Sequence, residues 1–147
     1  MRTYLVVMDE SAEARAALRY AARRAARTGG SVELLTVIER IEVVEWGGVQ
    51  AAMEEEARLR AEAMVLQASA AITEEAGIQP RVTVRGGDPV EAVTEILRER
   101  EEVAALILGA AAEGGPGPLV SHFAGTAAGT LPCPLVIVPA GYRGSEA

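Results

Sequence analysis

A glycine-rich segment late in the chain contains the residue types that bind phosphate in many α/β proteins. The segment comprises, in order, Leu106–Leu108, Gly109, Gly114, Gly115, Gly117 and the apolar run Leu135–Val138. A buried strand, a glycine-rich loop, a helix start and another buried strand favour a phosphate-binding corner, because glycine lets backbone amides approach an anion. Pro116 and Pro118 oppose this function, since each lacks an amide donor and stiffens the loop.

Four further side chains or backbone positions could contact a ligand. Asp9 could accept hydrogen bonds from a sugar hydroxyl or an adenine amine, or it could cap the following helix together with Ser11. Gly109 could let a phosphate approach the backbone, or it could permit a turn at the end of a strand. Ser121 could donate to an anion near a helix start. His122 could pair with phosphate and sense pH, or it could face solvent from a helix.

Charge and composition exclude several function classes. The formal net charge of −7 opposes binding to nucleic acid and to anionic lipid. The chain contains no lysine, which excludes Schiff-base chemistry and a Walker-type phosphate loop. Cys133, the one cysteine, lies between two prolines and is expected to be structural, and one histidine without ligand spacing predicts no metal site. Without a signal peptide or a spanning apolar run, a cytoplasmic location is expected.

The candidate residues are positioned by an alternating series of predicted strands and helices. The predicted strands are 4–8, 32–38, 81–85, 103–108 and 135–138. The predicted helices lie between Ser11 and Gly29, over 49–75, from Pro89 into the charged run 98–102, and over 119–130. This alternation predicts an α/β fold, a three-layer α/β/α sandwich around a five-stranded parallel sheet. Because the strand 81–85 alternates polar and apolar residues, it is expected at an edge, which favours the order 3-2-1-4-5.

That strand order predicts where a ligand binds. The chain reverses direction between the first and fourth strands, and ligands of open α/β sheets bind outside the carboxyl ends of strands at such a point. Asp9 and Gly109 end these two strands, so we expect them to meet in one pocket. A phosphoacceptor receiver is excluded, because no Asp follows the third strand and no Lys follows the fifth. A dinucleotide-binding loop is excluded because residues 9–13 contain no glycine.

Two segments outside the pocket have predicted structural roles. The helix 49–75 is expected to bury a stripe formed by Leu59, Ala63, Leu66 and Ala70. Trp46, just before this helix, is expected to cover a sheet edge, with stacking on a ligand as the alternative. The domain is expected to span 1–140, with a flexible tail over 141–147.

Four short segments, taken together, resemble a known family. The segments are Val6–Ser11, Thr36–Glu39, Gly87–Pro89 and Cys133–Val138. Their order and spacing resemble those of the universal stress protein family over nearly the whole chain. The resemblance implies an adenine-nucleotide α-hydrolase-like fold, dimerisation and a cytoplasmic role in stress survival, usually without a defined reaction.

The same resemblance implies which residues contact a nucleotide. Asp9 and Val37 match positions that contact adenine and ribose in nucleotide-bound members. ATP-binding members are similar to one another in a loop of the form Gly-x2-Gly-x9-Gly-Ser/Thr. Gly109 matches its first glycine, Ala112 its second, and Ser121-His122 its closing pair. Relative to the family loop, Ala112 adds a methyl group and His122 adds an imidazole. The loop therefore looks like that of a variant branch with a modified pocket.

The last predicted strand supplies an expected interface. Leu135, Val136, Ile137 and Val138 form an apolar strand at a sheet edge, which soluble proteins rarely leave open. The resemblance implies that this strand pairs with its copy in a homodimer, whereas the alternative is a cover formed by the tail with Tyr142. We predict a non-catalytic binding or regulatory module in the stress response. The alternative functions are an ATP-binding member with at most weak ATPase activity, taking ATP or AMP with Mg, and a pure interaction scaffold.

Overall fold

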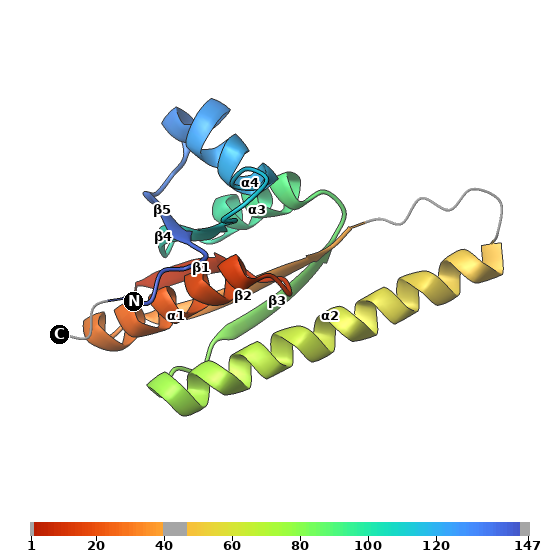
Figure 1. Cartoon of the computed structure of the whole chain (residues 1–147), viewed down its shortest axis with the longest axis horizontal. Helices are drawn as coiled ribbons and strands as arrows, with labels where there is room; N and C mark the ends of the chain where they lie inside the picture. The colour runs from red at the N-terminus through yellow and green to blue at the C-terminus, as the bar shows by residue number, and fades with distance from the viewer. Residues whose placement is uncertain (1, 40–46, 145–147) are drawn as a thin grey trace.

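The alternating strands and helices build one parallel sheet that is covered on both faces. The computed structural model describes residues 2–39 and 47–144. Its strands are β1 Thr3–Val7, β2 Ser31–Ile38, β3 Arg81–Gly86, β4 Val103–Ala110 and β5 Leu135–Pro139. They lie in the order β3-β2-β1-β4-β5, and all neighbouring pairs are parallel. The predicted fold class and strand order are therefore confirmed (Figure 1).

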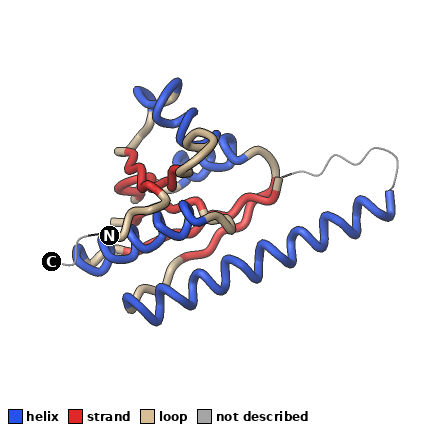
Figure 2. The backbone as a smooth tube through the Cα atoms, in the orientation of Figure 1, coloured by secondary structure: helices blue, strands red, loops and turns tan. Residues whose placement is uncertain are grey.

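Two separate apolar clusters pack on the two faces of the sheet. Alternate residues of β1 point to opposite faces, so Tyr4 and Val6 join one cluster while Leu5 joins the other. The first cluster includes residues of the helices α1 (Ala12–Thr28) and α2 (Gly47–Ala76), and the second includes residues of α3 (Pro89–Glu99) and α4 (Pro118–Ser121). Figure 2 shows the strands between these helices.

Two helices begin at the predicted capping residues. The Oγ of Ser11 accepts a hydrogen bond from the Ala14 amide at 3.1 Å at the start of α1. A carboxylate oxygen of Asp88 accepts one from the Glu91 amide at 3.0 Å at the start of α3. Helix α1 ends at Gly29, whose φ of 68° lies in the left-handed region that glycine tolerates best. These caps confirm the predicted helix starts.

The inner face predicted for α2 is wrong. Leu59 and Leu66 are 57% and 62% exposed, whereas Val65, Ala68 and Ile72 are buried against α1 and the sheet. Both sets have helical spacing, and one residue step turns a helix by about 100°, so the two stripes lie on different sides. The N-terminal part of α2 also extends past the sheet (Figures 1 and 2). Trp46 lies outside the described residues.

The predicted helix over 119–130 is divided into three short segments. The α-helical turn α4 is followed by the π-helix η1 (His122–Thr126) and the 3-10 helix η2 (Ala128–Thr130). The Ala127 amide donates to the His122 carbonyl at 3.0 Å, which closes the wider π turn. Gly125 and Gly129 lower the helix propensity of this segment by roughly 1 kcal/mol each relative to alanine, which favours the break.

One carboxylate is buried inside the sheet. Glu33 of β2 is 1% exposed, and its Oε1 accepts a hydrogen bond from Arg100 Nε at 3.2 Å. Its Oε2 accepts a second one from Thr83 Oγ1 at 2.7 Å. Arg100, with a side chain 14% exposed, also lies 3.4 Å from Glu99. The buried charge therefore links β2, β3 and the end of α3.

The chain after β5 returns to α1. The Tyr142 ring packs edge-on against Tyr20 with centroids 6.2 Å apart, and Arg23 donates to the Arg143 carbonyl at 2.8 Å. The remainder of the predicted tail, residues 145–147, lies outside the described residues. Among the helices of the described chain, none combines the length and the apolar character needed to cross a bilayer.

Candidate functional site

A cavity lies at the carboxyl ends of β1, β2 and β4. It has a volume of about 220 Å³ and is lined by Asp9, Val37 and Gly109, together with residues of α1 and the segment 116–120. The three residues are far apart in the sequence and meet because the strands that precede them are neighbours in the sheet. The structure thus brings together three of the six predicted contacts.

The carboxylate of Asp9 uses one of its two oxygens to support the start of α1. Its Oδ1 accepts a hydrogen bond from the Ser11 amide at 2.8 Å, which supports the turn before α1. Its Oδ2 has no hydrogen-bond partner within residues 2–39 and 47–144, and the side chain is exposed at the cavity. One acceptor oxygen of this carboxylate is therefore available to a ligand.

Gly109 does not form the turn predicted at the strand end, because β4 continues to Ala110. A Cβ atom at this position would overlap the carbonyl oxygen of Glu13 in the first turn of α1. The glycine is thus required for the close approach of α1 to β4. This packing also fixes the start of α1 beside the cavity.

The other three predicted contacts lie elsewhere. Ala112 is an exposed residue of the loop after β4, and Ser121 is exposed at the end of α4. His122 lies on η1 with its ring edge-on to Phe123, at a centroid distance of 4.9 Å, and lines a different cavity. None of the three lines the cavity that contains Asp9.

The loop after β4 presents prolines to the cavity. Its glycines Gly114, Gly115 and Gly117 have φ values of 76°, 86° and 103°, and the Ala111 amide donates to the Pro116 carbonyl at 3.3 Å, which folds the loop back. Pro116 and Pro118 line the cavity, together with Leu119. Neither proline has an amide hydrogen, so this wall offers few donors to a phosphate.

The charges around the cavity have one sign. Asp9, Glu13 and Glu39 line it, and no arginine or histidine does so in the described part of the chain. Glu39 follows β2 and Glu13 lies in the first turn of α1, and neither is among the contacts predicted from the sequence. The sequence signal for Glu39 is its position directly after a strand. The signal for Glu13 is its position at the start of the helix that follows another strand. These three carboxylates, the carboxylate rim, favour ligand groups that donate hydrogen bonds, such as hydroxyls and amines, over a polyphosphate without bound cations.

The Cys133 thiol and the metal-binding side-chain types of the described residues are the groups that a reactive cysteine or a metal site would use. Burial raises the pKa of the Cys133 thiol, which keeps it in the unreactive protonated form. Among residues 2–39 and 47–144, no cluster of three or more histidine, cysteine or carboxylate side chains is arranged to hold a metal ion.

The predicted interface strand lies at the edge of the sheet. β5 pairs with β4, and its other edge has no strand beside it within the described chain. Ile137 is 42% exposed, Leu135 and Val136 are partly buried, and Val138 is 2% exposed in the core. Of the four predicted residues, Val138 therefore faces the interior.

The fold and the cavity define an open α/β protein with a cavity at the topological switch point of its sheet, where ligands of this class bind. Within that class, the chain belongs to the universal stress protein family, whose model matches residues 1–139. No curated protein matches it by sequence.

Solved structures show the same fold at low sequence identity. The universal stress protein UspA from Lactobacillus plantarum is 17% identical, with a TM-score of 0.77 over 93% of this chain and 97% of that one. A universal stress protein from Archaeoglobus fulgidus in complex with dAMP is 18% identical, with a TM-score of 0.63 over 94% and 97%. A family member from Arabidopsis thaliana with AMP bound is 14% identical, with a TM-score of 0.57 over 99% and 94%.

Proposed function

We propose that this chain is a non-catalytic, homodimeric regulatory module of the cytoplasmic stress response that binds the nucleoside part of an adenine nucleotide. The proposal rests above all on the cavity at Asp9, which has three carboxylates and no basic side chain among its described lining residues. Its volume of about 220 Å³ is below the roughly 300–1,000 Å³ typical of complete ligand sites. A nucleoside moiety is thus a better match than a complete triphosphate.

The ligands of related structures support this class. Structures of family members contain dAMP, AMP and, in a third case, cAMP, all of which carry a single phosphate. In this chain the free oxygen of Asp9 would accept a hydrogen bond from a ribose hydroxyl or the adenine amine. Val37 would contact the apolar faces of the sugar or base. The phosphate would remain near solvent, away from the carboxylates.

ATP binding is the second candidate, because the left-handed glycines of the loop could expose amides as an anion-binding nest. The two candidates differ in the effect of added phosphates. If repulsion by the three carboxylates outweighs attraction by the loop amides, Mg-ATP binds no more tightly than adenosine. If attraction by the loop amides outweighs this repulsion, the affinity of the protein for the nucleotide rises with each added phosphate.

Calorimetric titration of the purified protein with adenosine, AMP and Mg-ATP tests this proposal. We expect adenosine or AMP to bind, and Asp9→Asn to weaken binding by at least about tenfold through loss of a charge-assisted hydrogen bond. Glu10→Gln is the matched control, because Glu10 is an exposed neighbour outside the cavity lining. Undiminished binding by Asp9→Asn would place the ligand elsewhere, and tighter binding of Mg-ATP would favour the ATP-binding candidate.

The proposed dimer rests on the open edge of β5. An exposed, apolar edge strand tends to pair with another strand, and Ile137 is 42% exposed there. We expect a dimeric mass by light scattering for the native chain and a monomeric mass for Ile137→Arg. Leu59→Arg on α2 is the control, since it charges an equally apolar exposed position away from β5. A dimer that survives Ile137→Arg contradicts this interface.

A further inference from the structure

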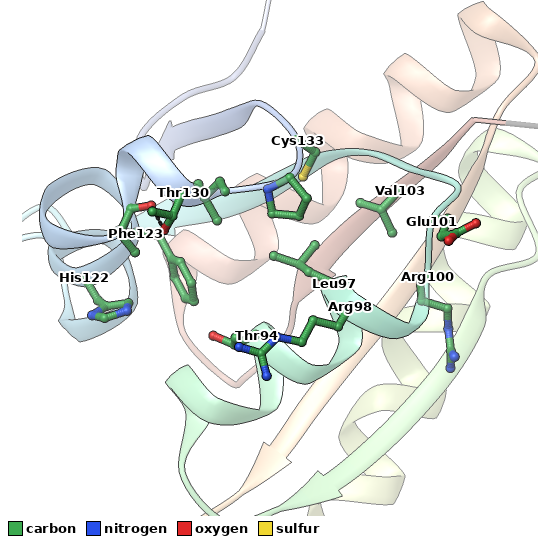
Figure 3. Close-up of a pocket in the computed structure, with 13 residues that line it drawn as sticks. Thr94, Leu97, Arg98, Arg100, Glu101, Val103, His122, Phe123, Thr130 and Cys133 are labelled. Atoms are coloured by element: carbon green, nitrogen blue, oxygen red, sulfur yellow. Dashed lines mark hydrogen bonds between the residues drawn. The ribbon is translucent and has the colours of Figure 1, made fainter.

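A second, larger cavity lies at the opposite end of the strands. It has a volume of about 630 Å³ and shares no lining residue with the cavity at Asp9. Its walls come from the C-terminal half of α3, from η1 and η2, from the start of β4 and from the segment that precedes β5 (Figure 3). This volume is within the range of about 300–1,000 Å³ typical of sites that bind small organic ligands.

The inner wall of this cavity is apolar. Leu97, Val103 and Phe123 line it and are 6%, 8% and 2% exposed, so they are fixed in the core. Leu131 and Cys133 continue the same wall and are partly buried. A hydrocarbon chain or ring would be removed from water against these side chains, which is favourable by roughly 25 cal/mol for each Å² of apolar surface buried.

A cationic side chain with no partner among the described residues lies at the mouth of the cavity. Arg98 forms no ion pair or hydrogen bond to any residue of the described chain, unlike Arg100, which contacts Glu33 and Glu99. Arg98 lies one helical turn after Thr94, and Figure 3 shows its side chain extending toward Thr94, on the side where His122 lies. Glu101 points away from them in the same view. The rim therefore has an accessible guanidinium and imidazole on one side.

The π-helix η1 contributes two consecutive residues to the lining of this cavity. His122 and Phe123 both line it, and the hydrogen bond from the Ala127 amide to the His122 carbonyl closes the wide turn that contains them. Single π-helical turns are rare and occur frequently at functional sites. This observation is independent of the volume and charge of the cavity.

We propose that this cavity binds an amphipathic monocarboxylic acid. The hydrocarbon part lies against Leu97, Val103 and Phe123, and the carboxylate is bound by the Arg98 guanidinium, with His122 beside it. An apolar wall with a cation at the rim matches the two parts of such a molecule. The site is separate from the proposed nucleoside cavity and does not depend on it.

Three small molecules separate the two parts of this recognition. Titration of the isotope-labelled full chain with decanoate, below its micellar concentration, is followed by amide NMR shifts. We expect decanoate to shift the amides of residues 122–131 and to bind about tenfold more tightly than decanol, which lacks the carboxylate. Acetate, which lacks the chain, is expected not to bind. Equal affinity for decanoate and decanol, or no binding of decanoate, overturns the proposal.

Variants locate the site and control for folding. Arg98→Gln, at an exposed position, is expected to fold and to reduce decanoate affinity to that of decanol. Ala127→Phe is expected to fill the cavity and prevent binding of both molecules. Arg27→Gln on α1 removes the same charge elsewhere and is expected to change neither affinity. Unchanged decanoate affinity in Arg98→Gln overturns the proposed role of the guanidinium, whether or not Ala127→Phe folds.

Discussion

Removing Arg100 should destabilise the fold more than removing the carboxylate that it contacts. In Arg100→Met, Glu33 remains 1% exposed with Thr83 as its one hydrogen-bond partner among the described residues. Breaking a buried ion pair in this way costs roughly 3–5 kcal/mol. In Glu33→Gln, by contrast, the Arg100 guanidinium retains Glu99 at 3.4 Å, and the new amide can still accept from Thr83. We expect that change to cost only about 1–3 kcal/mol.

Urea unfolding and thermal unfolding, both followed by circular dichroism, measure the free energy and the Tm of each variant. A chain of this size loses about 2–4 °C in Tm for each kcal/mol, so Arg100→Met should lower Tm by roughly 6–20 °C. Arg27→Met controls for loss of an exposed arginine. The double variant Glu33→Leu with Arg100→Met should be more stable than Arg100→Met alone, because no buried charge is left unpaired. If the double variant is instead less stable than Arg100→Met, or if Arg100→Met costs less than Glu33→Gln, the reasoning is refuted.

Two further predictions concern packing and acid stability. Gly109→Ala should destabilise by about 1–3 kcal/mol through overlap with α1, whereas Gly125→Ala, whose added methyl meets no atom within 4 Å, should not; urea midpoints compare them. The hydrogen bond from Arg85 lowers the pKa of Glu99, so this carboxylate stabilises the fold above its ordinary value of about 4, and that contribution is lost as pH falls through the lowered pKa. Arg85→Gln should therefore reduce the loss of Tm on acidification, and a parallel pH profile for both proteins would contradict this.

The sheet and its ligand end could be predicted because several local signals agreed. The polar and apolar alternation of 81–85 placed β3 at the edge, and from that order the meeting of Asp9 and Gly109 followed. The caps at Ser11 and Asp88 were readable because their side chains act on amides only three residues away. Local chemistry and topology thus predicted that Asp9 and Gly109 line the same cavity.

Other features of the fold and the site depend on tertiary packing that the sequence alone does not reveal. Helix α2 has two stripes with helical spacing, and contact with α1 and the sheet decides that Val65 rather than Leu66 is buried. Counting residues along the loop placed Ser121 and His122 at the phosphates, but the folded-back loop and the π turn direct them elsewhere. The close contact of Gly109 with α1 likewise arises from tertiary packing and has no signal in the local sequence.

The overhang of α2 divides this helix into two parts with different sources of stability. Residues 51–56 are all exposed, whereas Val65, Ala68 and Ile72 are anchored in the core. The first part is held mainly by its own backbone hydrogen bonds and by pairs such as Glu56 with Arg60, 3.8 Å apart. Its amides should consequently exchange with deuterium through local fraying, while those of the anchored part await opening of the whole sheet. The helix would then unwind from its N-terminal end, while the cavity at Asp9 and the cavity at Arg98 keep their lining residues.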